Sequence, residues 1–184
     1  MKPRLVVLIL CASLLAAMQA RAAKVILPKA CGDDNVKFDV STQKGQPAPA
    51  APEAGKAQLV FIETMEKGGY SCIGHCPEFV TRVGLDGAWI GANKGNSFFA
   101  YTVEPGEHHL CVDWQSVRGK LRRKVGMDAF ILDPGTVYYY QVKVRDIMMS
   151  DTYSELDLKL VALSQDEANY LFPLSALSTS KPKK

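Results

Sequence analysis

The chain has 184 residues, 47% of them hydrophobic, with 22 basic residues, 19 acidic residues and a formal net charge of +3. Three of the basic residues, Lys2, Arg4 and Arg21, lie in the first 22 positions, which hold no acidic residue, so 19 basic residues remain against 19 acidic ones. The chain after residue 22 is therefore formally neutral. This argues against a nucleic-acid-binding protein, because such proteins present a basic surface to the phosphate backbone.

The first 22 residues have the pattern of a secretory signal peptide. A basic start precedes an apolar run over residues 5–18, and Ala20-Arg21-Ala22 supplies the small residues that a signal peptidase reads. Because the apolar run is too short to span a bilayer comfortably, we expect cleavage after Ala22 and no transmembrane segment in the mature chain. The sequence therefore predicts a protein that is exported to the periplasm or secreted.

Residues 23–55 are expected to form an N-terminal arm. Val36, Phe38 and Val40 alternate with polar residues, a pattern typical of a short strand over residues 36–40. The stretch that follows, STQKGQPAPAAPEAGK, is rich in Pro, Ala and Gly and poor in bulky apolar residues. We expect it to be an extended connector.

Residues 56–174 are expected to form one all-β domain. The predicted strands cover residues 57–63, 79–85, 88–92, 97–103, 108–117, 129–132, 137–144 and 156–163. Asp86-Gly87 predicts a tight hairpin turn, and two further turns contain Pro105-Gly106 and Asp133-Pro134-Gly135. About eight short strands at this spacing favour an antiparallel β-sandwich of the immunoglobulin-like or transthyretin-like type.

One short helix is predicted near the C-terminus. Ser164 and Glu167 in LSQDEANYLFP form a capping box, and Pro173 ends the helix. Residues 175–184 consist mostly of Ser, Thr, Lys and Pro and are predicted to be disordered. The basic stretch 118–124 and the lysines of this tail are interpreted as solvated segments, with contact to anionic lipid or polysaccharide as the alternative.

Four cysteines follow the leader: Cys31, Cys72, Cys76 and Cys111. In an oxidising compartment they predict a disulfide framework with three possible pairings. Cys72 and Cys76 are close enough in sequence to pair locally, which would leave Cys31 with Cys111. In the chain-entropy model the short loop would contribute about 2 kcal/mol and the long loop about 4.5 kcal/mol. The long bridge would attach the arm to the β domain.

The stretch EPGEHHLCVDW, residues 104–114, gathers several side chains that bind metals in other proteins. Adjacent side chains of a strand point to opposite faces, so Glu107, His109 and Cys111 share one face while His108 lies on the apolar face. This triple is a candidate transition-metal site, and Cys72 and Cys76 extend it to a candidate zinc or thiol site. Since thiols of exported proteins tend to oxidise, we predict no metal, cofactor or catalytic residue.

Two aromatic residues are candidate ligand contacts. Trp89 follows the predicted Asp86-Gly87 turn, and Tyr139 lies on the face of the 137–144 strand opposite to Tyr138 and Tyr140. Exposed aromatic rings stack on sugars, so Trp89 and Tyr139 together suggest a carbohydrate-binding platform. Ordinary strand packing accounts for both residues as well.

Four stretches occur in a fixed order over residues 55–174: GKAQLVFIE, RVGLDGAWIGANKGNSFFAYTVEPGEHHL, LDPGTVYYYQVKV and LSQDEANYL. This order resembles the bacterial family known as domain of unknown function 2846. The resemblance implies a small secreted or lipid-anchored β protein of bacteria and brings no catalytic residues with it. The SCIGHC stretch and the arm lie outside the family pattern.

Three functions follow from these observations. The first is a non-catalytic binding or scaffolding protein of the cell envelope, whose partner is an envelope protein or a glycan and can be recruited by strand addition at a sheet edge. The second is a carbohydrate-binding module that uses Trp89 and Tyr139. The third is a metal- or thiol-dependent enzyme built on Cys72, Cys76, Cys111 and His109. Candidate contacts for a ligand or partner are Trp89, Tyr139, His109 and Glu107.

Overall fold

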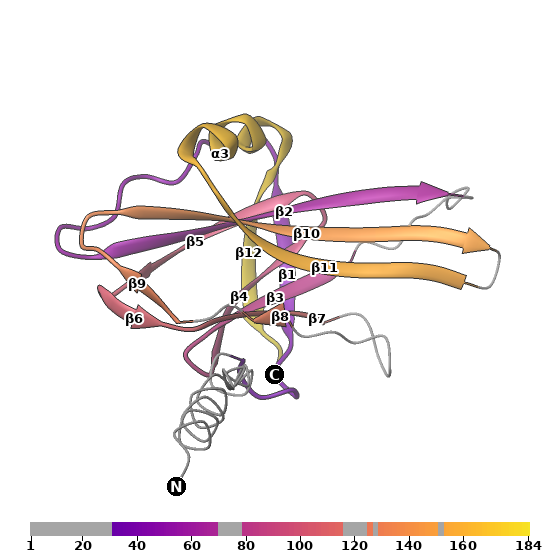
Figure 1. Ribbon diagram of the computed structural model, residues 1–184, viewed down its shortest axis with the longest axis horizontal. Coiled ribbons are helices and arrows are strands. Elements are labelled where there is room, and N and C mark those ends of the chain that lie inside the picture. Colours follow the sequence, from indigo (N-terminus) through magenta and orange to yellow (C-terminus); the bar gives the residue numbers. More distant parts are fainter. Residues whose placement is uncertain (1–30, 70–78, 116–124, 127–128, 151–152) are drawn as a thin grey trace, which may run out of the picture.

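The computed structural model describes residues 31–69, 79–115, 125–126, 129–150 and 153–184. The predicted signal peptide, Cys72, Cys76 and the basic stretch 118–124 lie outside these residues. The described part is an all-β fold with one short α-helix, as predicted (Figure 1). Within it, no helix has the length and apolar character needed to cross a bilayer.

The larger sheet has six strands. In spatial order they are β1 (Phe38–Gln43), β12 (Ala176–Pro182), β5 (Ser97–Val103), β2 (Ala57–Gly69), β10 (Val137–Ser150) and β11 (Tyr153–Leu163). The pairs β2–β10 and β5–β12 run parallel, and the other pairs run antiparallel. The sheet is therefore mixed, whereas the sequence predicted antiparallel pairing. Strands β2, β10 and β11 are longer than predicted and extend together past the smaller sheet (Figure 1).

The smaller sheet has four antiparallel strands. They are ordered β4 (Ala88–Lys94), β3 (Val80–Leu85), β7 (Leu110–Trp114) and β8 (Val125–Gly126), and a separate ladder joins β6 (Gly106–His108) to β9 (Phe130–Leu132). The predicted turn between β3 and β4 is confirmed. Asp86 and Gly87 have φ angles of 49° and 86°, the left-handed values that a two-residue hairpin turn requires and that Asp-Gly tolerates.

The core lies between the two sheets. It is made of the apolar side chains on their facing sides: Ala57, Leu59, Phe61, Val83, Leu85, Phe99, Val103, Leu110, Val112, Trp114, Leu132, Tyr140, Val142, Val144 and Leu158. Phe61 is its centre, with ring centroids 5.2 Å from Phe99 and 5.8 Å from Tyr140. Successive side chains of a strand point to opposite faces, so the alternating apolar residues of β2, β7 and β10 all point into the core. The immunoglobulin-like or transthyretin-like arrangement remains a prediction.

The outer face of the six-stranded sheet is covered by a helical segment. It consists of α3 (Gln165–Leu171) and the 3-10 helix η3 (Phe172–Leu174), and the predicted capping box of Ser164 and Glu167 is present. Phe172 packs edge-on against Phe98 of β5, with centroids 5.0 Å apart, in a second apolar cluster. Figure 1 shows this segment above the sheet.

The C-terminal tail is not disordered, contrary to the prediction from its composition. Residues 176–182 form β12, which pairs with β1 over residues 177–182 and with β5 at Ala176 and Leu177. Ser178 and Ser180 exchange hydrogen bonds with the backbone of Ala92 on β4. Backbone pairing and short polar side chains stabilise a strand here that has little apolar patterning, so β1 and the tail both belong to the β domain.

Candidate functional site

Strand β7, which contains the cysteine of EHHLC, is buried on both faces. Leu110, Val112 and Trp114 enter the core, as predicted. Cys111 and Asp113 point the other way and are also fully buried. The face expected to be polar and accessible is instead covered by residues 31–37, the described part of the predicted N-terminal arm that precedes β1; from here on, the arm means these residues.

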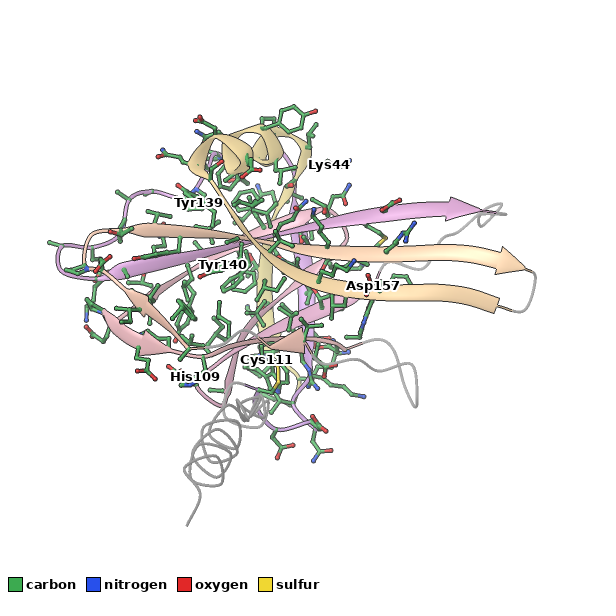
Figure 2. All side chains as sticks on the ribbon, viewed as in Figure 1. Lys44, His109, Cys111, Tyr139, Tyr140 and Asp157 are labelled. Carbon is green, nitrogen blue, oxygen red and sulfur yellow. A yellow bond between two sulfur atoms is a disulfide. The ribbon has the colours of Figure 1, made fainter. Side chains whose placement is uncertain are left out.

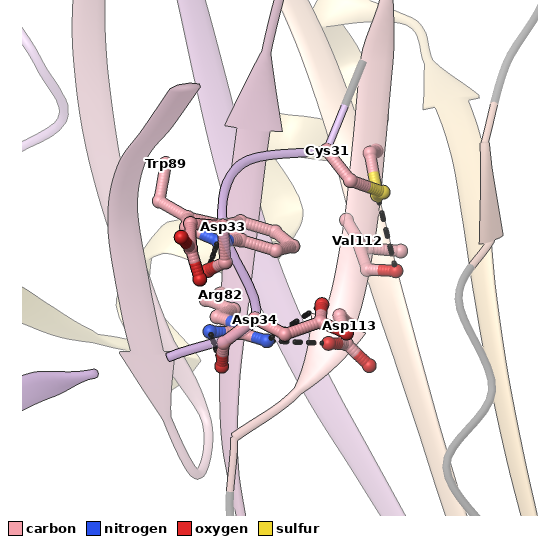
Figure 3. The surroundings of a disulfide bond; sticks show 8 residues. Cys31, Asp33, Asp34, Arg82, Trp89, Val112 and Asp113 are labelled. Atoms are coloured by element: carbon pink, nitrogen blue, oxygen red, sulfur yellow. Dashed lines mark hydrogen bonds and ion pairs between the residues drawn. A yellow bond between two sulfur atoms is a disulfide. The ribbon is translucent and has the colours of Figure 1, made fainter. Parts of the chain in front are cut away.

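A disulfide between Cys31 and Cys111 fastens the arm to β7, with 5.2 Å between the two Cα atoms (Figure 3). Of the three pairings that the sequence allowed, this bond belongs to the one in which Cys72 would pair with Cys76. It also contradicts the hypothesis that Cys111 is a free thiol or a metal ligand, because its sulfur is bonded to that of Cys31. The disulfide thus joins two segments that are 80 residues apart in the sequence.

Arg82 of β3 is the charged centre of the contact beneath the arm. One of its terminal nitrogens lies 2.8 Å from a carboxylate oxygen of Asp113, and both side chains are almost completely buried. The other donates to the backbone carbonyls of Asp34, at 3.2 Å, and of Val36. A guanidinium group is suited to this role because its planar set of donors reaches several acceptors at once.

Trp89 of β4 completes this contact. The guanidinium carbon of Arg82 lies 4.0 Å from the centroid of the Trp89 ring, a cation–π geometry. The indole N–H donates to the carbonyl of Asp33 at 2.7 Å. Gly32 passes so close to the indole that a Cβ there would lie 2.5 Å from Cδ1 of Trp89. Trp89 is therefore packed between Arg82 and the arm, with its polar hydrogen bonded to that arm.

The two histidines of EHHLC fix the junction between β6 and β7. Nδ1 of His108 lies 2.6 Å from a carboxylate oxygen of Asp86, and Nε2 lies 2.8 Å from the carbonyl of Glu104. The backbone N–H of His109 donates to the same carboxylate at 2.8 Å. Burial raises the pKa of Asp86, but the hydrogen bonds from His108 and His109 outweigh this effect, so the net pKa is lowered. The histidines thus tie the Asp86-Gly87 turn to the neighbouring strand.

The predicted triple of Glu107, His109 and Cys111 does not form a site. Glu107 is exposed and pairs through its backbone with Ile131 of β9, His109 lies between β6 and β7, and Cys111 is covered by the arm. Among the residues that the structure describes, no three His, Cys, Asp or Glu side chains are placed to hold a metal ion. The three side chains therefore lie in different surroundings, although their spacing along one predicted strand had suggested a common site.

Tyr139 and Trp89 are also not brought together. Tyr139 lies on the outer face of the six-stranded sheet and packs against Phe172, with ring centroids 6.2 Å apart. Trp89 lies on the outer face of the smaller sheet, on the other side of the core. Figure 2 shows Tyr139 toward the helical segment and Cys111 on the opposite layer. The two rings therefore form no common platform for a sugar.

An open pocket of about 690 Å³ lies where four separate segments meet. Its walls are Thr42 of β1 with Lys44 and Gly45 just after that strand, Met65 of β2, residues 94–96 from the end of β4 into the turn before β5, and residues 173–176 from η3 into the start of β12. Two lysines, Lys44 and Lys94, line it, and none of its lining residues is acidic. We call it the lysine pocket. Its volume is in the range of small-molecule sites in proteins.

A buried carboxyl group lies behind the pocket wall. Glu63 of β2 has no exposed surface, one of its oxygens accepts a hydrogen bond from Thr81, and the other has no partner within the described residues. Burial raises the pKa of Glu63 well above its ordinary value, and the Thr81 hydrogen bond and the nearby backbone of Gly95 only partly offset this. Because Gly95 lines the pocket, the carboxyl group is next to it and is uncharged over a wider pH range than an exposed glutamate.

The sequence interpretation missed Arg82, Glu63 and the two lysines. Alternation along AQLVFIE does place Glu63 on the same face as Leu59 and Phe61, so this buried charge was open to prediction. The lysine pocket was not, because one of its walls comes from a tail that its composition assigned to disorder.

No protein-family model matches the chain, and searches of curated proteins and of solved structures found no match either. The resemblance to domain of unknown function 2846 therefore remains a prediction.

Proposed function

We propose that the protein is a non-catalytic, exported binding protein of the bacterial cell envelope and that it holds its ligand in the lysine pocket. The observation that carries this proposal is the pocket itself, a cavity of about 690 Å³ with two cationic side chains and no acidic one on its walls. A concave cavity of this volume is the usual form of a small-molecule site.

The Cys31–Cys111 disulfide supports export, because structural disulfides persist in oxidising compartments. The histidines and Cys111 are engaged in structural contacts within the described residues, which favours binding over catalysis. A disulfide-fastened arm and a two-sheet core together supply a rigid frame for a preformed pocket.

The proposal is tested by two-dimensional ¹H–¹⁵N NMR of the mature chain during titration with a small-molecule extract of bacterial envelopes. We expect concentration-dependent shifts in the amides of Gly45, Gly95, Asn96 and Ser175, which line the pocket. Shifts confined to other surfaces, such as the faces that carry Tyr139 or Trp89, would contradict the assignment of the pocket as the binding site.

A further inference from the structure

His108, the last residue of β6, lies between two hydrogen-bond acceptors. Its Nδ1 is 2.6 Å from a carboxylate oxygen of Asp86, in the turn between β3 and β4, and its Nε2 is 2.8 Å from the backbone carbonyl of Glu104. Both distances are those of hydrogen bonds. The ring therefore joins the segment that leads into β6 to the hairpin turn of the smaller sheet. We call this contact the histidine bridge.

Only one protonation state of the ring satisfies both acceptors. A neutral imidazole has one N–H donor and one nitrogen lone pair, whereas the doubly protonated ring has two N–H donors. A backbone carbonyl cannot donate, and a carboxyl group donates only when it is itself protonated. Burial raises the pKa of Asp86, but the hydrogen bonds from His108 and His109 lower it overall, so this carboxylate is charged at neutral pH. The geometry therefore requires an imidazolium ring at His108.

We propose that the histidine bridge is a pH-sensitive contact, which is complete while the His108 ring is doubly protonated and is broken when one proton passes to water. The neutral ring keeps one of the two hydrogen bonds. Its other nitrogen then directs a lone pair at an acceptor oxygen, so the ring must turn or the two segments must separate. Imidazole is the side chain whose charge ordinarily changes between about pH 5 and pH 8. This contact is separate from the lysine pocket and does not depend on it.

The bridge holds a small part of the fold in place. The ladder of β6 with β9 has three residue pairs and belongs to neither of the larger sheets (Figure 1). The ring of Phe130 on β9 lies near that of His108, with 6.4 Å between the centroids. The backbone N–H of His109 donates to the second carboxylate oxygen of Asp86 at 2.8 Å, and the Asp86 N–H donates to the His109 carbonyl at 3.0 Å. We therefore expect a broken bridge to loosen first the His109 amide and this ladder.

The other titratable side chains at this corner, among the described residues, are His109, Glu104, Lys56 and Glu107. Nδ1 of His109 is 3.6 Å from Asp86, beyond hydrogen-bond length, and this side chain is 37% exposed against 13% for His108. The carboxylate of Glu104 pairs with Lys56, and Glu107 is exposed. The residues of β9 carry no charge. His108 is thus the histidine whose proton is required by the contacts around it.

The two charged partners of the bridge set opposite pH limits. The pKa of Asp86 is lowered from its ordinary 3.8, so its contribution to stability is present above pH 3.8 and is lost as the pH falls through the folded pKa. For His108 the sign is reversed, because the folded state holds the protonated form. Its contribution is present in acid and is lost as the pH rises and the ring gives up a proton. The bridge is therefore complete at mildly acidic pH.

The experiment is NMR spectroscopy of the mature, oxidised chain as the pH is raised from about 5 to about 8. Long-range ¹H–¹⁵N correlation reports the protonation of each ring nitrogen, and hydrogen exchange reports the protection of the His109 amide, which is bonded to Asp86. We expect both nitrogens of His108 to be protonated at the acidic end. As one of them loses its proton, protection of the His109 amide, corrected for the intrinsic exchange rate, should fall about tenfold or more. The amide of Phe61 in the core should not follow.

The variant Asp86→Asn distinguishes a pH-sensitive contact from a merely structural one. An asparagine side chain can donate to the unprotonated nitrogen of a neutral ring, and asparagine tolerates the left-handed φ of 49° at this position. Protection of the His109 amide should therefore no longer fall as the pH rises. His108→Gln should also remove this pH dependence. His109→Gln is the matched control, in which the amide of residue 109 should keep it.

Three results from the parent chain would overturn the inference. They are a His108 ring with one unprotonated nitrogen throughout the range, a ring that stays doubly protonated to about pH 8, or His109 protection that does not follow the ring. A fall in protection that persists in Asp86→Asn would overturn it as well. Because the parent chain alone can give the first three results, the test remains decisive even if a variant fails to fold.

Discussion

Removing the Cys31–Cys111 disulfide should cost the protein a large part of its stability. The change is the double substitution of Cys31→Ala with Cys111→Ala, which leaves the rest of the arm contact intact. The bond joins positions 80 residues apart, and in the chain-entropy model a loop of this length stabilises the folded state by about 4.5 kcal/mol at 25 °C. Small domains have only about 5–15 kcal/mol in total, so the variant should be marginally stable.

The assay is urea unfolding of the oxidised mature chain, followed by tryptophan fluorescence and circular dichroism. The matched comparison is Cys72→Ala with Cys76→Ala, which the chain-entropy model limits to about 2 kcal/mol if these two residues form the predicted local pair. We expect the unfolding midpoint to fall much further for the first variant than for the second. A loss below about 1 kcal/mol for the Cys31 and Cys111 variant would refute the assignment of this bond as the main cross-link of the fold.

Three further predictions concern buried groups. Asp113→Asn removes the buried carboxylate from Arg82 and leaves only the more exposed carboxylate of Asp34, 3.8 Å away. Urea unfolding should show a loss of about 3 kcal/mol because a buried guanidinium loses its closest counter-charge; an unchanged midpoint would contradict this pairing. Gly32→Ala places a Cβ 2.5 Å from the Trp89 ring. We expect the free energy of unfolding to fall by about 1–3 kcal/mol and the Trp89 fluorescence to shift. Full stability with unshifted emission would show that the arm does not pack there. In the folded protein the pKa of Glu63 is raised above its ordinary value of 4.5. The contribution of Glu63 to the free energy of unfolding is therefore fully present below pH 4.5 and is lost as the pH rises through the folded pKa. Glu63→Gln should therefore flatten the decline in stability as the pH rises above 4.5, and a pH profile parallel to that of the parent would argue against a buried acid.

Local signals predicted the strands and turns well. Asp86-Gly87 forms the expected hairpin because few residue pairs accept two positive φ angles, and Ser164 with Glu167 caps the expected helix. Alternation along residues 137–144 placed Tyr140 in the core and Tyr139 on the outer face. These features depend on neighbours in the chain, so one sequence is enough to find them.

Contacts between distant segments were harder to predict. The face of β7 that carries Cys111 and Asp113 looked polar and open because the alternation rule describes one strand and not what covers it. The arm covers it, and Arg82, which strand patterning gave no reason to single out, neutralises Asp113. In the same way, β12 has no strong strand pattern and depends on β1 for its pairing. Long-range partners of this kind leave little trace in local composition.

The measurement that tests the account most directly is mass spectrometry of the protein purified from its native compartment, first under native conditions and then denatured. We expect a chain that begins at Ala23, lacks four hydrogens through two disulfides, carries no metal and releases a small bound molecule on denaturation. A bound zinc ion or free thiols at Cys31 and Cys111 would contradict it. So would a retained leader or a native mass equal to that of the denatured chain.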